Sequence, residues 1–150
     1  MISLVLQSIA WMALAQPAEA PDMSLENVGI TCVALAVFAE ARSEPYSGQL
    51  AVAAVIRERQ RLAVFGVDPC DIINEPNQFH GIRDWPMPRT GTLLREPVAW
   101  EQAMKAAEDV YYKRVSTGKC EGSVYFQTRV APVPKGRTIT CEVGSHVFSK

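Results

Sequence analysis

The residue best suited to chemistry is Glu40, at the end of an almost wholly apolar stretch. The run VGITCVALAVFAEA, residues 28–41, has no charged residue before Glu40. At a helical period of 3.6 residues, Val33, Ala36 and Val37 share one stripe with Glu40. A carboxyl group among apolar neighbours, in the last turn of a helix, holds its proton more readily than one in water. General-acid catalysis needs such a proton, so Glu40 is the candidate catalytic residue.

The same stretch has a plainer interpretation, because short patterns of this kind often occur without a function. Glu40 would then be an ordinary carboxylate at the end of a buried helix, paired with Arg42 or Arg57. The residues of this stretch leave both interpretations open.

Three helices are expected around this residue. Apolar periodicity predicts a helix over Leu25–Arg42, capped by Ser24. Pro45 disfavours helix continuation but suits the first turn of a new helix, which we expect to run to about Val64. A third helix is predicted from Pro97 to about Val115. The segments SVYFQT, TITCEV and HVFS alternate as short strands do, which predicts a small antiparallel sheet or hairpin.

Residues 65–97 are different in kind, because five prolines and three glycines forbid long regular elements there. A long irregular segment inside a compact domain is often functional. The segment carries Gln78, Phe79, His80 and Trp85, and such rings and polar groups suit sugar binding. A loop held in place by its own aromatic residues explains them equally well.

Composition describes one domain of ordinary size. The chain has 150 residues, 48% hydrophobic and 21% charged, with a net charge of −1. We expect a signal or anchor segment at 1–15, a linker at 16–23 and a single domain at 24–150. The balanced charge gives no argument for a nucleic-acid partner, whereas residues 1–15 offer a membrane contact.

Cysteine usage agrees with export from the cytoplasm. Four cysteines allow three pairings. A Cys120–Cys141 bridge would close a local hairpin-like segment, and a Cys32–Cys70 bridge would tie the central helix to the following loop. Four reduced thiols in a cytosolic protein are the alternative. No CxxC spacing occurs, so we expect no metal site and no cofactor.

The residues also resemble a known family, the SleB-type cell-wall hydrolases, which include spore-cortex-lytic enzymes and phage lysins. EARSEPYSGQLAVAAVIRER, residues 40–59, is similar to the family pattern EARGEP-x-x-GQ-x-AVA-x-V-x-x-N-R. Weaker matches follow in the family's order: NQF at 77–79, GSVYF at 122–126 and VGSHVF at 143–148. The chain departs from the family pattern at Ser43, Glu58, His80, Tyr125 and Ser149.

This resemblance implies a lysozyme-like α+β fold, with helices around a central buried helix plus a small antiparallel sheet or hairpin. It implies cleavage of the MurNAc–GlcNAc bond of peptidoglycan by lytic transglycosylation, with Glu40 as general acid and then base. It further implies substrate-binding roles for Glu44, Gln78, Phe79, Tyr125 and His146. The expected partner is a peptidoglycan glycan strand, in the periplasm or cell envelope.

Other functions stay open at this stage. A muramidase using water would need the same acid. A catalytically weak wall-binding or virion structural module would keep the fold, and the departures at Ser43, His80 and Tyr125 give that alternative some weight. A phage virion or lysis protein would differ in location and partners. A disulfide-stabilised domain that binds a protein partner is the remaining alternative.

Overall fold

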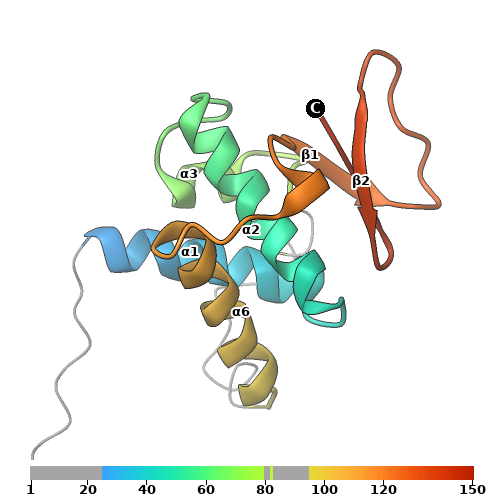
Figure 1. The fold of residues 1–150 in the computed structure, drawn as a ribbon. Helices are drawn as coiled ribbons and strands as arrows, with labels where there is room; N and C mark the ends of the chain where they lie inside the picture. Colours follow the sequence, from blue (N-terminus) through green and yellow to red (C-terminus); the bar gives the residue numbers. More distant parts are fainter. Residues whose placement is uncertain (1–24, 80–81, 83–94) are drawn as a thin grey trace, which may run out of the picture.

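The structure is a computed structural model that describes residues 25–79, 82 and 95–150. These residues form four α-helices, one 3-10 turn and three strands (Figure 1). The elements are α1 (Leu25–Ala41), α2 (Tyr46–Arg61), α3 (Pro69–Asn74), α6 (Pro97–Tyr111), η1 (Gly118–Cys120), β1 (Tyr125–Thr128), β2 (Ile139–Val143) and β3 (His146–Ser149). The α+β class predicted from the sequence is therefore confirmed.

Helix α1 is the central buried helix that the apolar run predicts. It packs against α2, α3 and α6, and Val33, Ala36, Val37 and Phe38 are fully buried. A helix that is apolar nearly all round is stable only when neighbours cover it on several sides. The last turn of α1, which carries Glu40, is therefore fixed by the whole helical part of the molecule.

The predicted helices all end too late. Helix α1 ends at Ala41 rather than Arg42, and a turn follows in which the Glu44 amide donates to the Ala41 carbonyl at 3.0 Å. Helix α2 ends at Arg61 rather than Val64, since Ala63 has a left-handed φ of 53°. Helix α6 ends at Tyr111 rather than Val115, and Arg114 is left-handed as well. The predicted cap Ser24 lies outside the described residues.

Helix α3 is a short element that the sequence analysis did not predict within residues 65–97. The Asp68 side chain caps it by accepting a hydrogen bond of 2.7 Å from the Cys70 amide, and Pro69 occupies its first turn. His80 and Trp85 lie outside the described residues.

The sheet has the order β1-β3-β2, and both pairs are antiparallel. All four residues of the central strand β3 are buried, and Phe126 of β1 lies opposite Phe148. The three predicted strands are confirmed, although β1 starts at Tyr125 and β2 at Ile139, later than the sequence patterns begin. In Figure 1 the sheet lies to one side of the helices, and β1 is a strand that contacts α2.

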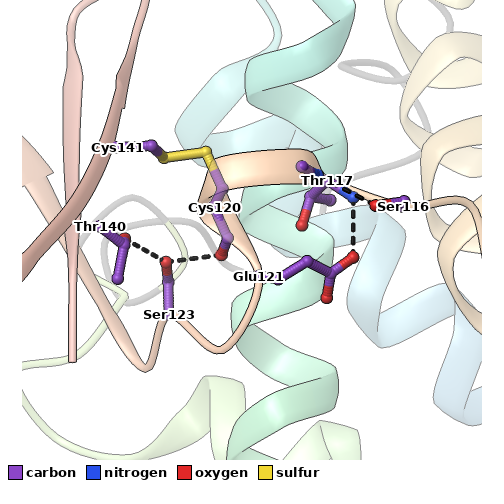
Figure 2. The surroundings of a disulfide bond; sticks show 8 residues. Ser116, Thr117, Cys120, Glu121, Ser123, Thr140 and Cys141 are labelled. Atoms are coloured by element: carbon purple, nitrogen blue, oxygen red, sulfur yellow. Dashed lines mark hydrogen bonds between the residues drawn. A yellow bond between two sulfur atoms is a disulfide. The ribbon is translucent and has the colours of Figure 1, made fainter.

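Two disulfides bind these parts together. Cys32–Cys70 joins α1 to α3, and Cys120–Cys141 joins η1 to β2. Both agree with the bridges considered from the sequence. Figure 2 shows that the Ser123 hydroxyl lies beside the second bridge, donating to the Cys120 carbonyl at 2.6 Å. Ser123 is also hydrogen-bonded to the Thr140 hydroxyl at 2.6 Å.

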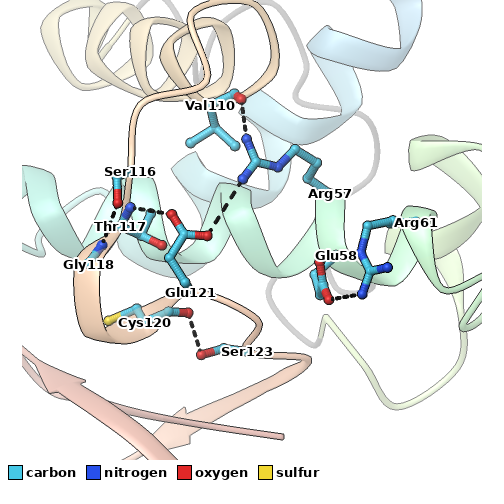
Figure 3. A network of polar contacts seen from close by, with 10 residues as sticks. All are labelled: Arg57, Glu58, Arg61, Val110, Ser116, Thr117, Gly118, Cys120, Glu121 and Ser123. Atoms are coloured by element: carbon cyan, nitrogen blue, oxygen red, sulfur yellow. Dashed lines mark hydrogen bonds and ion pairs between the residues drawn. The ribbon is translucent and has the colours of Figure 1, made fainter.

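Polar contacts hold the end of α6 and the residue after η1 to α2 (Figure 3). Arg57 of α2 donates to the Val110 carbonyl at 2.6 Å and lies 4.0 Å from the Glu121 carboxylate. Glu121 in turn accepts the Thr117 amide at 2.9 Å. These contacts fix the start of the path that leads the chain from the helices to the sheet.

None of the described helices is long and apolar enough to cross a membrane. The predicted signal or anchor segment at 1–15 and the linker at 16–23 lie outside the described residues.

Candidate active site

A cavity of about 340 Å³ lies where the helices meet the sheet. It draws on the last turn of α1, the end of α2, the segment after α3, strand β1, the loop after β1 and the start of β3. The described residues that line it are Glu40, Arg59, Asn77, Gln78, Tyr125, Phe126, Gln127, Thr128, Ala131, Arg137 and His146.

Glu40 enters this cavity from a rigid support. Its neighbour Ala41 is fully buried, and Phe38, two residues earlier, packs edge-on against Trp100 with ring centroids 6.0 Å apart. Glu40 itself is partly exposed. Among the described residues that line the cavity, only Glu40 carries a carboxylate. The buried stripe of α1 thus delivers one acid to a space that a ligand can enter.

Three of the other predicted site residues share the cavity with Glu40, namely Gln78, Tyr125 and His146. His146 is 5% exposed, and its ring meets the Phe126 ring edge-on at 5.3 Å. Its Nδ1 atom is buried and has no hydrogen-bond partner within the described part of the chain. The cavity therefore combines amide and imidazole groups with aromatic rings.

Phe79 and Glu44 lie elsewhere. Phe79 is 2% exposed, packs against Phe126 at 5.9 Å, and lines a separate cavity of about 140 Å³ beside α3. Glu44 does not line the Glu40 cavity. It accepts the Ser145 amide at 2.8 Å and also the Ser145 hydroxyl. Both residues therefore support the walls of the site rather than its interior.

The Glu44–Ser145 contact fastens the α1–α2 turn to the β2–β3 turn. Partial burial would raise the pKa of the Glu44 carboxyl, but the Ser145 hydrogen bonds and the His146 imidazole outweigh this and lower the pKa. Gly144 makes the approach feasible, because a Cβ there would collide with the Glu44 carboxylate. The contact holds His146, the next residue after Ser145, at the cavity wall.

Arg59 is a cavity residue that the sequence analysis did not single out. It is 2% exposed, and its Nε donates to the Val124 carbonyl at 2.7 Å. Burial lowers the pKa of its guanidinium to about 10. A signal was present in the sequence, because Arg59 continues the helical stripe of Val52, Val55 and Ile56 into the core.

The described residues contain no group of three His, Cys, Asp or Glu side chains that could hold a metal ion. What the cavity offers instead is one carboxyl group, several amides, an imidazole and two guanidinium groups. One carboxyl group can deliver a proton to a leaving oxygen and take one back.

Comparison with known proteins places these features in a family. A family model described as cell wall hydrolase matches residues 43–149, beginning three residues after Glu40. The spore cortex-lytic enzyme of Bacillus subtilis is 32% identical over 141 residues, which cover 91% of this chain and 43% of that protein. The spore cortex-lytic enzyme of Halalkalibacterium halodurans is 46% identical over 122 residues, covering 79% of this chain and 34% of that protein. The chain thus spans less than half the length of these curated relatives.

A solved structure agrees with the family match. The catalytic domain of the Bacillus cereus SleB protein superposes with a TM-score of 0.61 and 26% identity. The alignment covers 91% of this chain and 99% of that domain. The likeness confirms the lysozyme-like fold expected from the sequence resemblance. The chain belongs to the cell wall hydrolase family.

Proposed function

We propose that this chain is a peptidoglycan lytic transglycosylase that cleaves the MurNAc–GlcNAc bond with Glu40 as its acid and base. The observation that carries the proposal is the cavity in which Glu40 is the one carboxylate among the described lining residues. Hydrolytic glycosidases of the usual kind need two carboxyl groups flanking the bond. Lytic transglycosylation needs one, because the substrate supplies its own nucleophile.

The reaction proceeds in two proton transfers. Glu40 first donates its proton to the glycosidic oxygen, the bond from that oxygen to C1 of MurNAc breaks, and GlcNAc leaves with the proton. Positive charge develops at C1, where the neighbouring N-acetyl oxygen stabilises it. The Glu40 carboxylate then removes the proton of the MurNAc 6-hydroxyl as that oxygen bonds to C1. The product carries a 1,6-anhydro ring, and Glu40 has regained its proton.

Side chains around Glu40 suit a sugar ligand. Asn77, Gln78 and Gln127 present amide groups, which donate to and accept from hydroxyl and N-acetyl groups. Tyr125 and Phe126 present aromatic rings from the adjacent strand. The Gln127 amide is itself oriented, since its Nε2 donates to the Ala131 carbonyl at 2.6 Å. We expect Gln78, Tyr125 and His146 to contact the glycan.

A location in the cell envelope follows from the proposed substrate, since peptidoglycan lies outside the cytoplasmic membrane. The two disulfides agree with an oxidising compartment. The curated relatives are named for the spore cortex. The kind of wall preparation that the protein clears distinguishes a role in the spore, in the cell envelope or in phage lysis.

The test is wall clearing in a gel that contains purified peptidoglycan. Wild-type protein should clear the gel, and Glu40→Gln should lower activity by about 1,000-fold or more, because the glutamine amide neither donates nor accepts the required proton. Glu101→Gln makes the same change at an exposed position on α6 and should clear the gel normally. Full activity of Glu40→Gln would refute the proposal. If the wild-type protein sediments with walls but does not cleave them, it is a wall-binding module.

A further inference from the structure

Two guanidinium groups share the cavity with Glu40 beside the Tyr125 ring. The Arg137 Cζ atom lies 3.6 Å from the centre of this ring, and the Arg59 Cζ atom lies 5.5 Å from it. Both arginines line the cavity. We call Arg59 and Arg137 the arginine pair.

Neither member of the arginine pair has an anionic partner among the described residues. The ion pairs formed by the described residues involve neither Arg59 nor Arg137. The Arg59 Nε donates a hydrogen bond to the Val124 carbonyl, but the buried Nη1 of Arg59 has no hydrogen-bond partner within the described residues. Arg59 also contacts the rings of Phe65 and Phe79, at 5.1 and 5.2 Å.

This arrangement of charges is unfavourable for the fold. A buried charge without a counter-ion destabilises a fold, and the two positive charges also repel each other. Both effects appear in the pKa of Arg59, which burial, and to a smaller extent the charge of Arg137, lowers. Aromatic rings offset part of the cost through cation–π contacts. An anion bound beside Tyr125 would offset the rest, and Glu40 is the one acid among the described lining residues.

We propose that the arginine pair binds a carboxylate of the glycan strand and thereby selects strands that carry one. This inference rests on the proposed function, because it takes peptidoglycan as the ligand. Arg137 is partly exposed and makes the direct contact, for which a planar guanidinium is suited by its paired N–H donors. Arg59 adds a second positive charge from within the wall.

Peptidoglycan offers this carboxylate from two sources. The lactyl group of muramic acid ends in a free carboxylate where the stem peptide has been removed. Where the peptide is present, its own carboxylates replace it. Either anion lies on the muramic acid side of the bond that Glu40 is proposed to cleave, so binding it would also set the direction of the strand in the cavity.

The experiment measures binding apart from turnover. In a Glu40→Gln background, calorimetry would follow three soluble glycans: strands stripped of peptide with free lactyl carboxylates, the same strands converted to methylamides, and peptide-bearing strands. Arg137→Gln should weaken binding of at least one carboxylate-bearing glycan by about 10-fold, the loss expected for one charge-assisted contact. Binding of the methylamide strands should not change. The carboxylate-bearing glycan that is affected identifies the source of the anion.

Two further variants sharpen the result. Lys135→Gln removes a positive charge from an exposed position in the same loop, outside the cavity lining, and should leave all three affinities unchanged. Arg137→Lys keeps the charge but not the paired donors, and should recover part of the loss.

Two outcomes would overturn the inference: equal binding of all three glycans by the unmodified arginine pair, or an equal loss of affinity for all three glycans in Arg137→Gln. Wall clearing separates these failures from failure of the proposed function. If walls are cleared in a Glu40-dependent way while glycan affinity does not depend on the carboxylates, only the arginine-pair inference fails. If the carboxylate preference holds but walls are not cleared, only the proposed reaction fails.

Discussion

At the scale of single residues, Glu44 and Gly144 show how closely the two halves of the molecule approach. The Glu44 carboxylate sits against the β2–β3 turn and accepts two hydrogen bonds from Ser145. Gly144 has a φ of +55°, and a Cβ there would also lie 2.9 Å from Pro45 Cδ. Few other residues fit a left-handed position against such a neighbour.

Gly144→Ala tests this contact. The left-handed backbone alone should cost about 1 kcal/mol of unfolding free energy. The collision with Glu44 should add about 1 to 3 kcal/mol. Gly122→Ala is the matched control, since Gly122 has a φ of +74° but open space around its Cβ position. Urea denaturation measures the unfolding free energy of both variants. Equal losses would show that the collision with Glu44 adds nothing to the cost of the left-handed backbone.

Only some of the residues that form the site could be recognised from the sequence. Glu40 stands out in the sequence because it is the first charge after a long apolar run. Arg59 does not, since it lies between two other arginines, Arg57 and Arg61. Only the helical period separates the buried Arg59 from the partly buried Arg57 and the exposed Arg61. Arg137 gives no local signal, because its partner Tyr125 is brought beside it by the fold.

At the scale of elements, each disulfide fixes one part of the site. Cys32–Cys70 holds α3 against α1, and Cys120–Cys141 holds η1 against β2. Strand β2 in turn pairs with β3, which begins with the cavity residue His146.

Removing either bridge should destabilise the fold strongly. The loops that they close span 38 and 21 residues, for which chain entropy gives about 3 to 4 kcal/mol each. We expect that loss of unfolding free energy in the double variants Cys32→Ala/Cys70→Ala and Cys120→Ala/Cys141→Ala. Denaturant titration would measure it, with chemically reduced wild type as the comparison. Unchanged midpoints in both variants would contradict a stabilising role.

Helices and strands were predictable to the extent that their cause is local. Apolar periodicity located α1, α2 and α6, and alternation located all three strands. Helix ends were misplaced because left-handed residues such as Ala63 and Arg114 are set by tertiary contacts rather than by residue type. Helix α3 was not predicted because the residues that begin it, Asp68 and Pro69, are also common in loops.

At the scale of the whole molecule, α6 is joined to the start of α2 by one buried carboxylate. Asp109 accepts the Tyr46 hydroxyl at 2.7 Å, Lys105 Nζ at 2.6 Å and Lys113 Nζ at 2.7 Å. The hydrogen bonds from Lys105, Lys113 and Tyr46 hold the pKa of the Asp109 carboxyl far below its usual range.

This lowered pKa predicts an acid-sensitive fold. A carboxyl with a folded pKa below its unfolded value of about 3.9 stabilises the protein above that pH. Its contribution is lost as the pH falls from about 4 toward the folded value. Asp109→Asn should therefore cost about 1 to 3 kcal/mol at neutral pH and lessen the loss of stability below pH 4. Thermal melts between pH 7 and pH 2 would check this.

Asp71→Asn is the control for that series, because Asp71 is exposed on α3 and should leave the acid-induced loss unchanged. If Asp109→Asn kept the full acid dependence of the wild type, the carboxylate would not be the group responsible.

The sequence alone did not predict which segments of the chain form the walls of the cavity. Its walls come from segments as far apart as Glu40 and His146, and only the docking of the sheet on the helices brings them together. The family resemblance named Glu40, Gln78, Tyr125 and His146, which lie there, but it did not indicate that Phe79 and Glu44 lie in the walls or that two arginines share the cavity.

The most direct test of the central claim is the mass of the products released from purified peptidoglycan. If Glu40 acts as acid and then base on the substrate's own 6-hydroxyl, wild-type protein should release fragments with 1,6-anhydro muramic acid ends, each lighter by one water than a hydrolysis product. Glu40→Gln should release none. Fragments with reducing ends, or release by Glu40→Gln at the wild-type rate, would contradict this mechanism.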